Sequence, residues 1–127
     1  MSLTYIIYIG IGGFFGAILR FVLSSGTFHL FGGYIPYGTL AVNVIGSFLI
    51  GILVLYFQQN IAPEYRAFFI TGFLGSLTTF SAFSLETALM IDEQEYLKAA
   101  LHTFLNVTLS VGATISAMML FKKYYLP

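Results

Sequence analysis

The chain has 127 residues, is 58% hydrophobic and only 8% charged, and has a mean hydropathy of +0.91. Five Lys/Arg and five Asp/Glu side chains cannot coat a soluble domain of this size, so the apolar surface is expected to face lipid. The balanced charge gives no basic face for nucleic acid, and the lack of cysteine excludes disulfides and thiolate metal sites. We therefore expect an all-α integral membrane protein without a nucleic-acid partner.

Four apolar stretches are long enough to cross a bilayer, whose hydrocarbon core of about 30 Å needs about 20 residues of helix. They cover residues 3–25, 37–57, 67–91 and 99–121. The connections between them are short, so we expect one four-helix membrane domain over residues 1–127. No Lys or Arg precedes Arg20 and no small-residue cleavage site follows, so the first stretch is interpreted as a retained helix and not as a signal peptide.

The first stretch carries a face of small residues that includes Gly12, Gly13 and Gly16. Small residues allow helix backbones to approach closely within lipid, and we interpret this face as a packing surface. Arg20 lies one turn beyond it. A guanidinium at this depth either snorkels to the interface or lines water, where it would concentrate anions at a pore mouth.

The third stretch is unusually polar for a membrane helix. Its polar and small residues are Thr71, Gly72, Gly75, Ser76, Thr78, Thr79, Ser81, Ser84, Glu86 and Thr87. Such a segment is costly against lipid, so it is expected to face protein or water. Non-helical backbone at membrane depth is tolerated where it lines a cavity, and it makes good ion sites. We predict a break in the helix within residues 75–79.

The distribution of basic residues gives almost no orientation preference. Arg66, Lys122 and Lys123 fall on one side of four spans, and Arg20 and Lys98 fall on the other. A chain without bias can insert both ways, and the simplest use of both orientations is an antiparallel twofold homodimer. If Arg20 is too deep to count, a single orientation is expected instead.

Polar residues form one stripe on the second predicted helix. Thr39, Asn43, Ser47 and Gly51 follow one another at four-residue spacing, which places them on one face. The amide of Asn43 offers two donors that can bind an anion without a fixed counter-charge. The alternative is that Asn43 bonds to a neighbouring helix.

Phe80 and Phe83 lie three residues apart, just after the predicted break and among Thr79, Ser81 and Ser84. Aromatic rings have a positive edge, which can contact an anion. Apolar rings beside hydroxyl donors suit a weakly held, partly dehydrated small anion, although Phe pairs in membrane helices usually only pack.

The fourth predicted helix repeats the polar stripe through His102, Asn106 and Ser110. A proton site at His102 is one interpretation, but no carboxylate at helical spacing accompanies it, so packing is favoured. Glu86 is the only carboxylate well inside a span. A proton-coupled transporter would make Glu86 essential, whereas a channel would tolerate it near a vestibule. No nucleophile with a base, no metal-ligand cluster and no phosphate-binding loop occurs, so an enzyme is not expected.

Three sequence blocks resemble the Fluc family, also called CrcB, of dual-topology fluoride channels. They read G-G-F-F-G-A-I-L-R-F at residues 12–21, G-T-L-A-V-N-V-I-G-S-F at residues 38–48 and G-F-L-G-S-L-T-T-F-S-A-F-S at residues 72–84. The blocks lie in three of the four predicted helices, and the chain length fits the family. The fourth helix matches through Asn106 and Ser110.

The resemblance implies an antiparallel homodimer in the cell (inner) membrane, inserted in both orientations, that lets fluoride leave passively and so confers fluoride resistance. Its pathway residues would be Phe80, Phe83, Asn43, Ser81, Thr39 and Ser110. Arg20 would lie in the vestibule. A structural Na⁺ on the twofold axis would be held by backbone carbonyls of Gly75 and Thr78.

Two other functions are left open. A small multidrug-type, proton-coupled exporter also has four short helices, but it would need a carboxylate in the first helix, which has none. A non-transporting scaffold subunit would use the polar stripes to join helices. Composition and spacing alone predict only a small-ion pathway.

Overall fold

The computed structural model describes residues 2–59 and 61–126, and every element within them is helical. Four stretches are long and apolar enough to cross a membrane: Leu3–Phe31, Tyr37–Tyr56, Pro63–Asp92 and Tyr96–Tyr125. The expected all-helical architecture with four spans is thereby confirmed. The first span runs past residue 25 to Phe31, and the fourth is longer at both ends than residues 99–121.

The first two helices are separated by a turn whose residues fix the ends. Helix α1 (Leu3–Phe31) begins after Ser2, whose hydroxyl accepts a hydrogen bond from the Thr4 N–H at 3.3 Å. It ends at Gly32, which has φ +77° and donates its N–H to the Phe28 carbonyl at 3.0 Å. Pro36 then precedes helix α2 (Tyr37–Tyr56), as its restricted backbone favours.

The third span consists of several helical pieces in series. Helix α3 (Pro63–Arg66) leads into a wide π-helical segment, η1 (Ala67–Leu74), which is followed by the short α4 (Gly75–Leu77) and by α5 (Phe80–Asp92). Helix α6 (Tyr96–Tyr125) completes the chain. The π-helical segment is a departure from the single regular helix expected before the break, and such segments are frequent at functional sites.

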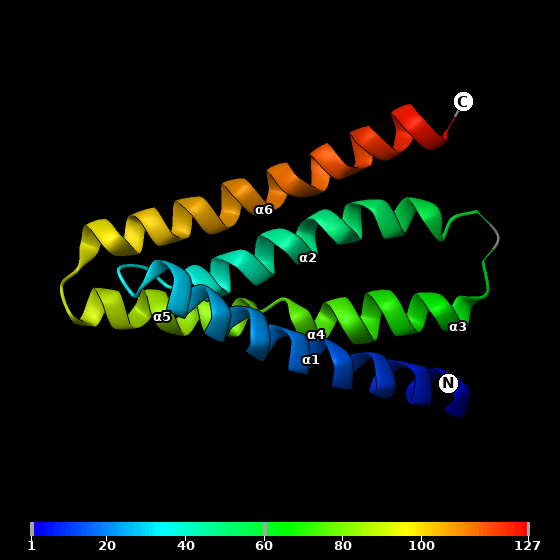
Figure 1. Cartoon of the computed structure of the whole chain (residues 1–127), viewed down its shortest axis with the longest axis horizontal. Helices are drawn as coiled ribbons and strands as arrows, with labels where there is room; N and C mark the ends of the chain where they lie inside the picture. Colours follow the sequence, from blue (N-terminus) through cyan, green and yellow to red (C-terminus); the bar gives the residue numbers. More distant parts are fainter. Residues whose placement is uncertain (1, 60, 127) are drawn as a thin grey trace.

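The helices lie roughly side by side, with α2 and the third span in the middle (Figure 1). Helix α6 packs on α2 and α5 on one side, and α1 packs on η1, α4 and α2 on the other. The start of α1, the end of α2, the start of α3 and the end of α6 lie at the same end of the bundle (Figure 1). The two central elements therefore have packing partners on both sides.

Glycines let α1 approach the third span at backbone contact. A Cβ added at Gly12 would collide with the carbonyl oxygen of Phe68, and one at Gly16 with that of Phe73. From the other side, a Cβ on Gly72 would lie 2.5 Å from the Ile9 carbonyl oxygen. The interpretation of the small-residue face as a packing surface is therefore confirmed.

The third span is interrupted at Thr78 and Thr79, within the range predicted for the break. Thr78 has φ −81° and ψ 155°, and Thr79 has φ −150° and ψ 113°, so both are extended. The Thr78 hydroxyl donates to the Leu74 carbonyl at 2.9 Å, and the Thr79 hydroxyl accepts from the Ala82 N–H at 3.1 Å. Threonine side chains thus bond the backbone at both ends of the break.

Most large apolar side chains face outward. Leu3, Phe21 and Leu97 are 70%, 73% and 78% exposed, while a small buried cluster of Val42, Leu74 and Leu77 lies between α2 and the third span. This distribution is the inverse of a soluble domain and matches a lipid-facing exterior. The polar side chains gather in the interior, beside the break.

Candidate functional site

A cavity of about 410 Å³ lies beside the break in the third span. Its walls come from α2, from the pieces of the third span on both sides of the break, and from α6. The residues that line it are Asn43, Gly46, Ser47, Ile50, Ile70, Leu74, Gly75, Thr78, Thr79, Phe80, Phe83, Asn106, Val107, Ser110 and Val111. The wall is mostly apolar, with a few amide, hydroxyl and backbone groups that can bind a small ligand.

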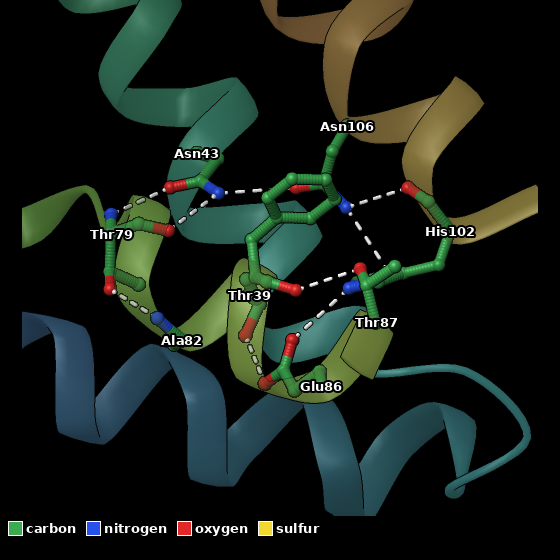
Figure 2. A network of polar contacts seen from close by, with 9 residues as sticks. Thr39, Asn43, Thr79, Ala82, Glu86, Thr87, His102 and Asn106 are labelled. Atoms are coloured by element: carbon green, nitrogen blue, oxygen red, sulfur yellow. Dashed lines mark hydrogen bonds and ion pairs between the residues drawn. The ribbon is translucent and has the colours of Figure 1, made fainter. Parts of the chain in front are cut away.

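Asn43 bonds directly to the interrupted backbone. Its Oδ1 accepts the Thr79 N–H at 2.8 Å, and its Nδ2 donates to the Thr79 carbonyl at 3.2 Å. The side chain therefore satisfies both polar groups of a residue that has left the helix, which would otherwise be costly inside a membrane. Figure 2 shows these two bonds at the edge of a larger polar network.

The network continues from α2 to α6. A second hydrogen of Asn43 Nδ2 is directed to Asn106 Oδ1 at 3.1 Å. Asn106 Nδ2 donates to the His102 carbonyl at 2.9 Å and lies 3.2 Å from His102 Nδ1. Asn106 is thus the point at which the polar stripes of α2 and α6 meet.

The far end of the network is a carboxylate on α5. His102 Nε2 lies 3.1 Å from Glu86 Oε2, and the Thr39 hydroxyl donates to Glu86 Oε1 at 2.6 Å (Figure 2). The His102 side chain is fully buried, while that of Glu86 is 27% exposed. Thr39 and Glu86 also line a separate cavity of about 300 Å³ near the turn between α1 and α2.

Two phenylalanine rings follow the break on α5. The centroids of Phe80 and Phe83 are 5.3 Å apart with the rings tilted by 60°, and Phe83 lies 5.3 Å from the His102 ring. Phe83 is buried, whereas Phe80 is 77% exposed on the single chain. The buried ring thus contacts both the network and the cavity, and the other ring extends outward from the cavity rim.

Ser110 contributes a hydroxyl with unused hydrogen-bonding capacity. Its Oγ is buried and has no hydrogen-bond partner among the described residues. It lines the same cavity as Asn106, one turn along α6. A buried hydroxyl without a partner costs free energy, so its presence here indicates a ligand or water position in the cavity.

The structure brings most of the residues expected from the sequence to one place. Asn43, Phe80, Phe83 and Ser110 line the cavity, together with Gly75 and Thr78.

Three expected residues do not line this cavity. Thr39 lies at the Glu86 end of the network, and the Ser81 hydroxyl lies 3.3 Å from that of Thr79. Arg20 lies half-buried on α1 and forms no ion pair within the described residues.

The contact between Glu86 and His102 was missed from the sequence. A carboxylate partner for His102 was sought on its own helix, but the partner comes from α5, across the helix packing. The signal that could have found it was the pairing of the one carboxylate deep in a span with the one histidine on the α6 stripe. Packing remains part of the role of His102, because its ring is fully buried.

Fold and site together define a multi-pass helical membrane protein whose third span is broken beside a cavity with a polar wall. A family model described as "CrcB-like protein, Camphor Resistance (CrcB)" matches residues 7–118. The chain belongs to this family. The match extends into all four spans and includes every residue of the cavity wall.

Relatives from several organisms match 80% or more of the chain, and each is named fluoride-specific ion channel FluC. The protein of a Nitratiruptor species is 53% identical over 98% of this chain and 98% of its own length. That of a Sulfurovum species is 51% identical over 92% and 93% of the two chains. The protein of Methanococcus maripaludis is 52% identical over 80% and 83%.

Proposed function

We propose that this protein is a fluoride-selective channel that lets fluoride leave the cell passively, down its own gradient and the membrane potential. It lowers cytoplasmic fluoride, confers fluoride resistance and is not an enzyme. The observation that carries the proposal is the cavity at the broken span, whose wall joins uncharged donors to phenylalanine rings. Relatives that are about half identical over most of the chain are named fluoride-specific ion channels, which supports the proposal.

The donors at this cavity suit an anion that must bind and then leave. A fixed positive charge would hold an anion too tightly, whereas a hydroxyl donor binds it more weakly. The Ser110 hydroxyl, which has no partner among the described residues, supplies one donor. The ring edges of Phe80 and Phe83 supply a weak positive potential where the anion has shed water.

The proposed pathway uses Phe80, Phe83, Asn43, Ser81, Thr39 and Ser110. Thr39 extends the pathway toward the second cavity, near the turn between α1 and α2. There the Thr39 hydroxyl donates a hydrogen bond to Glu86. Ser81 is joined to the cavity wall through the hydroxyl of Thr79. Arg20 raises the local anion concentration in the vestibule at the mouth of this pathway.

The proposed assembly is an antiparallel homodimer in the cell membrane, with each pathway built from both copies. Two features of the single chain support it: the high exposure of Phe80 just after the break, and the exposure of Gly75 just before it, both at the wall of the cavity. A polar break facing lipid would be unfavourable, so a second copy is the expected cover.

A structural Na⁺ on the twofold axis belongs to the same proposal, held by the carbonyl oxygens of Gly75 and Thr78 from both copies. No hydrogen bond within the described residues ends on either oxygen, and both residues line the cavity. Such oxygens at a helix terminus fit a hard cation. Replacing Na⁺ with a large organic cation should lower the temperature at which the dimer dissociates.

The deciding experiment is anion efflux from liposomes that contain the purified protein, with K⁺ and valinomycin setting the membrane potential. Rapid fluoride efflux without chloride efflux is the expected result. Liposomes without protein give the background leak. A well-folded protein that passes no fluoride would overturn the channel and return attention to Glu86 and proton-coupled transport.

A further inference from the structure

The polar network contains enough fixed bonds to determine the protonation pattern of its members. The starting point is the backbone of Thr79, whose N–H can only donate and whose carbonyl can only accept. Asn43 bonds both groups, so its Oδ1 faces the N–H and its Nδ2 faces the carbonyl. The orientation of the Asn43 amide follows from the break itself.

The orientation of Asn43 fixes that of Asn106. Because Asn43 directs an amide hydrogen at Asn106, the atom that receives it is Asn106 Oδ1, at 3.1 Å. Asn106 Nδ2 then faces His102, where one hydrogen goes to the His102 carbonyl at 2.9 Å. A flipped Asn106 would place its Nδ2 against Asn43 Nδ2, which is also a donor, and its Oδ1 against the His102 carbonyl oxygen, which is also an acceptor. The backbone carbonyl of His102 therefore confirms the orientation independently.

The orientation of Asn106 in turn fixes the histidine. The second hydrogen of Asn106 Nδ2 faces His102 Nδ1 at 3.2 Å, so Nδ1 must accept and carries no proton. The imidazole is then neutral with its hydrogen on Nε2, which points at Glu86 Oε2 at 3.1 Å (Figure 2). Glu86 accepts from Thr39 through its other oxygen, as a carboxylate does.

Resting on the function proposed above, we propose that His102 is a positioning residue for the anion pathway. Glu86 accepts the hydrogen on Nε2 of the neutral imidazole, at 3.1 Å. The unprotonated Nδ1 then accepts the second amide hydrogen of Asn106, so that no unpaired amide hydrogen of Asn106 faces the cavity.

Loss of the Nδ1 acceptor has a defined consequence for conduction. One amide hydrogen of Asn106 would be left without a partner on the cavity wall. An anion would satisfy it and be held there, and a site that holds its ion too well conducts poorly. Phe83 packs against the His102 ring, so the ring also keeps the aromatic wall in place. A variant must therefore separate the volume of the ring from its hydrogen bonds.

Few other titratable groups are available to disturb this arrangement. Within the described residues, Glu86 is the titratable side chain that faces His102 from the elements packed on α6. Lys98 on α6 itself is engaged with Glu95 at 2.7 Å and with the ring of Tyr34. The hydrogen-bond partners of His102 thus determine its form.

The direct test is spectroscopic. The chain has two histidines, and His29 is exposed near the end of α1, so His29→Phe leaves His102 as the only imidazole. In the ¹⁵N-labelled variant in lipid bilayers at neutral pH, we expect one protonated and one unprotonated nitrogen, with the hydrogen on Nε2. A hydrogen on Nδ1, or an imidazolium with both nitrogens protonated, would refute the proposal. Adding Glu86→Leu removes the acceptor at Nε2 but not the Asn106 donor at Nδ1, so it should weaken the preference without reversing it, whereas Glu86→Gln, which keeps an acceptor, should preserve it.

The functional test compares two substitutions at one position. His102→Phe keeps a ring but removes both hydrogen bonds, and fluoride efflux should fall by about tenfold, the effect of losing about one net hydrogen bond. His102→Gln keeps an N–H for Glu86 and a carbonyl oxygen for Asn106, and should recover much of the flux. His29→Phe should conduct as the original protein does.

The outcomes separate this proposal from the channel function. No fluoride efflux from the unchanged protein would contradict the function, and the spectroscopic result would still decide the form of His102. Normal efflux from His102→Phe, or a Gln variant no better than the Phe variant, would contradict the positioning role alone. If His102→Phe fails to fold, the spectrum of His29→Phe remains decisive.

Discussion

The side chain of Asn43 on α2 completes the hydrogen bonding of Thr79 in the third span, through one accepted bond of 2.8 Å and one donated bond of 3.2 Å. The Asn43 side chain thereby replaces the backbone hydrogen bonds that Thr79 would make to neighbouring turns in an unbroken helix. The same amide lines the cavity and leads to Asn106, so the structural and the proposed conducting roles of Asn43 are connected.

Asn43→Asp tests this connection with a change of nearly equal size. An aspartate can still accept from the Thr79 N–H, but it cannot donate to the Thr79 carbonyl or to Asn106 Oδ1. It also places a negative charge on the proposed anion path. We expect fluoride efflux to fall by at least about tenfold, from the lost donors alone.

The control for this charge is Gln59→Glu, in the exposed connection after α2. It should leave efflux unchanged, because it adds the same charge outside the cavity. Normal efflux from Asn43→Asp would remove Asn43 from the pathway.

Phe80→Ile tests the proposed aromatic contact with the ion. Phe80 is 77% exposed on the single chain and lies 5.3 Å from Phe83, so its loss should disturb the cavity rim more than the core. We expect slower fluoride efflux from a protein that elutes from a sizing column as before. Phe21→Ile, at a similarly exposed position on α1, should conduct normally. Unchanged efflux from Phe80→Ile would remove that residue from the ion path.

Much of the fold follows from residue types that act locally. Apolar length predicts the four spans, and the glycines with the Thr78–Thr79 pair predict the break, because these residues weaken a helix wherever they occur. The ends of the first and fourth spans were set too short. Apolar windows do not detect the cap at Gly32, nor the Lys98–Glu95 bridge in the first turn of α6.

The site was harder to predict than the spans, because its contacts cross between helices. The stripes on α2 and α6 indicated polar faces, but not that Asn43 would bond the backbone of Thr79. Nor could spacing along one helix pair Glu86 with His102. The π-helical form of η1 is likewise not evident from its apolar sequence.

Ser110→Ala separates stability from function. The Ser110 hydroxyl is buried without a partner among the described residues, so its removal should not lower thermal stability and should raise it slightly, by up to about 1 kcal/mol. Fluoride efflux should nevertheless fall, because a donor on the cavity wall is lost. Ser116→Ala, at an exposed position on α6, should change neither quantity. A Ser110→Ala protein that is less stable but conducts normally would show that the hydroxyl is structural.

Gly46→Ala tests how closely α2 must approach the break. A Cβ at position 46 would collide with the side-chain methyl of Thr78, whose carbonyl is proposed to bind Na⁺. Thr78 is held in place by its hydrogen bonds to Leu74, so it cannot move aside without disturbing the break. We expect a loss of about 1–3 kcal/mol in unfolding free energy, typical of overpacking, together with slower efflux.

Gly10→Ala is the matched control, because nothing lies within 4 Å of its added Cβ. Thermal unfolding in detergent and efflux from liposomes would be measured on both variants. A Gly46→Ala protein as stable and as conductive as Gly10→Ala would show that the break tolerates a shift of α2, and that its geometry does not depend on this contact.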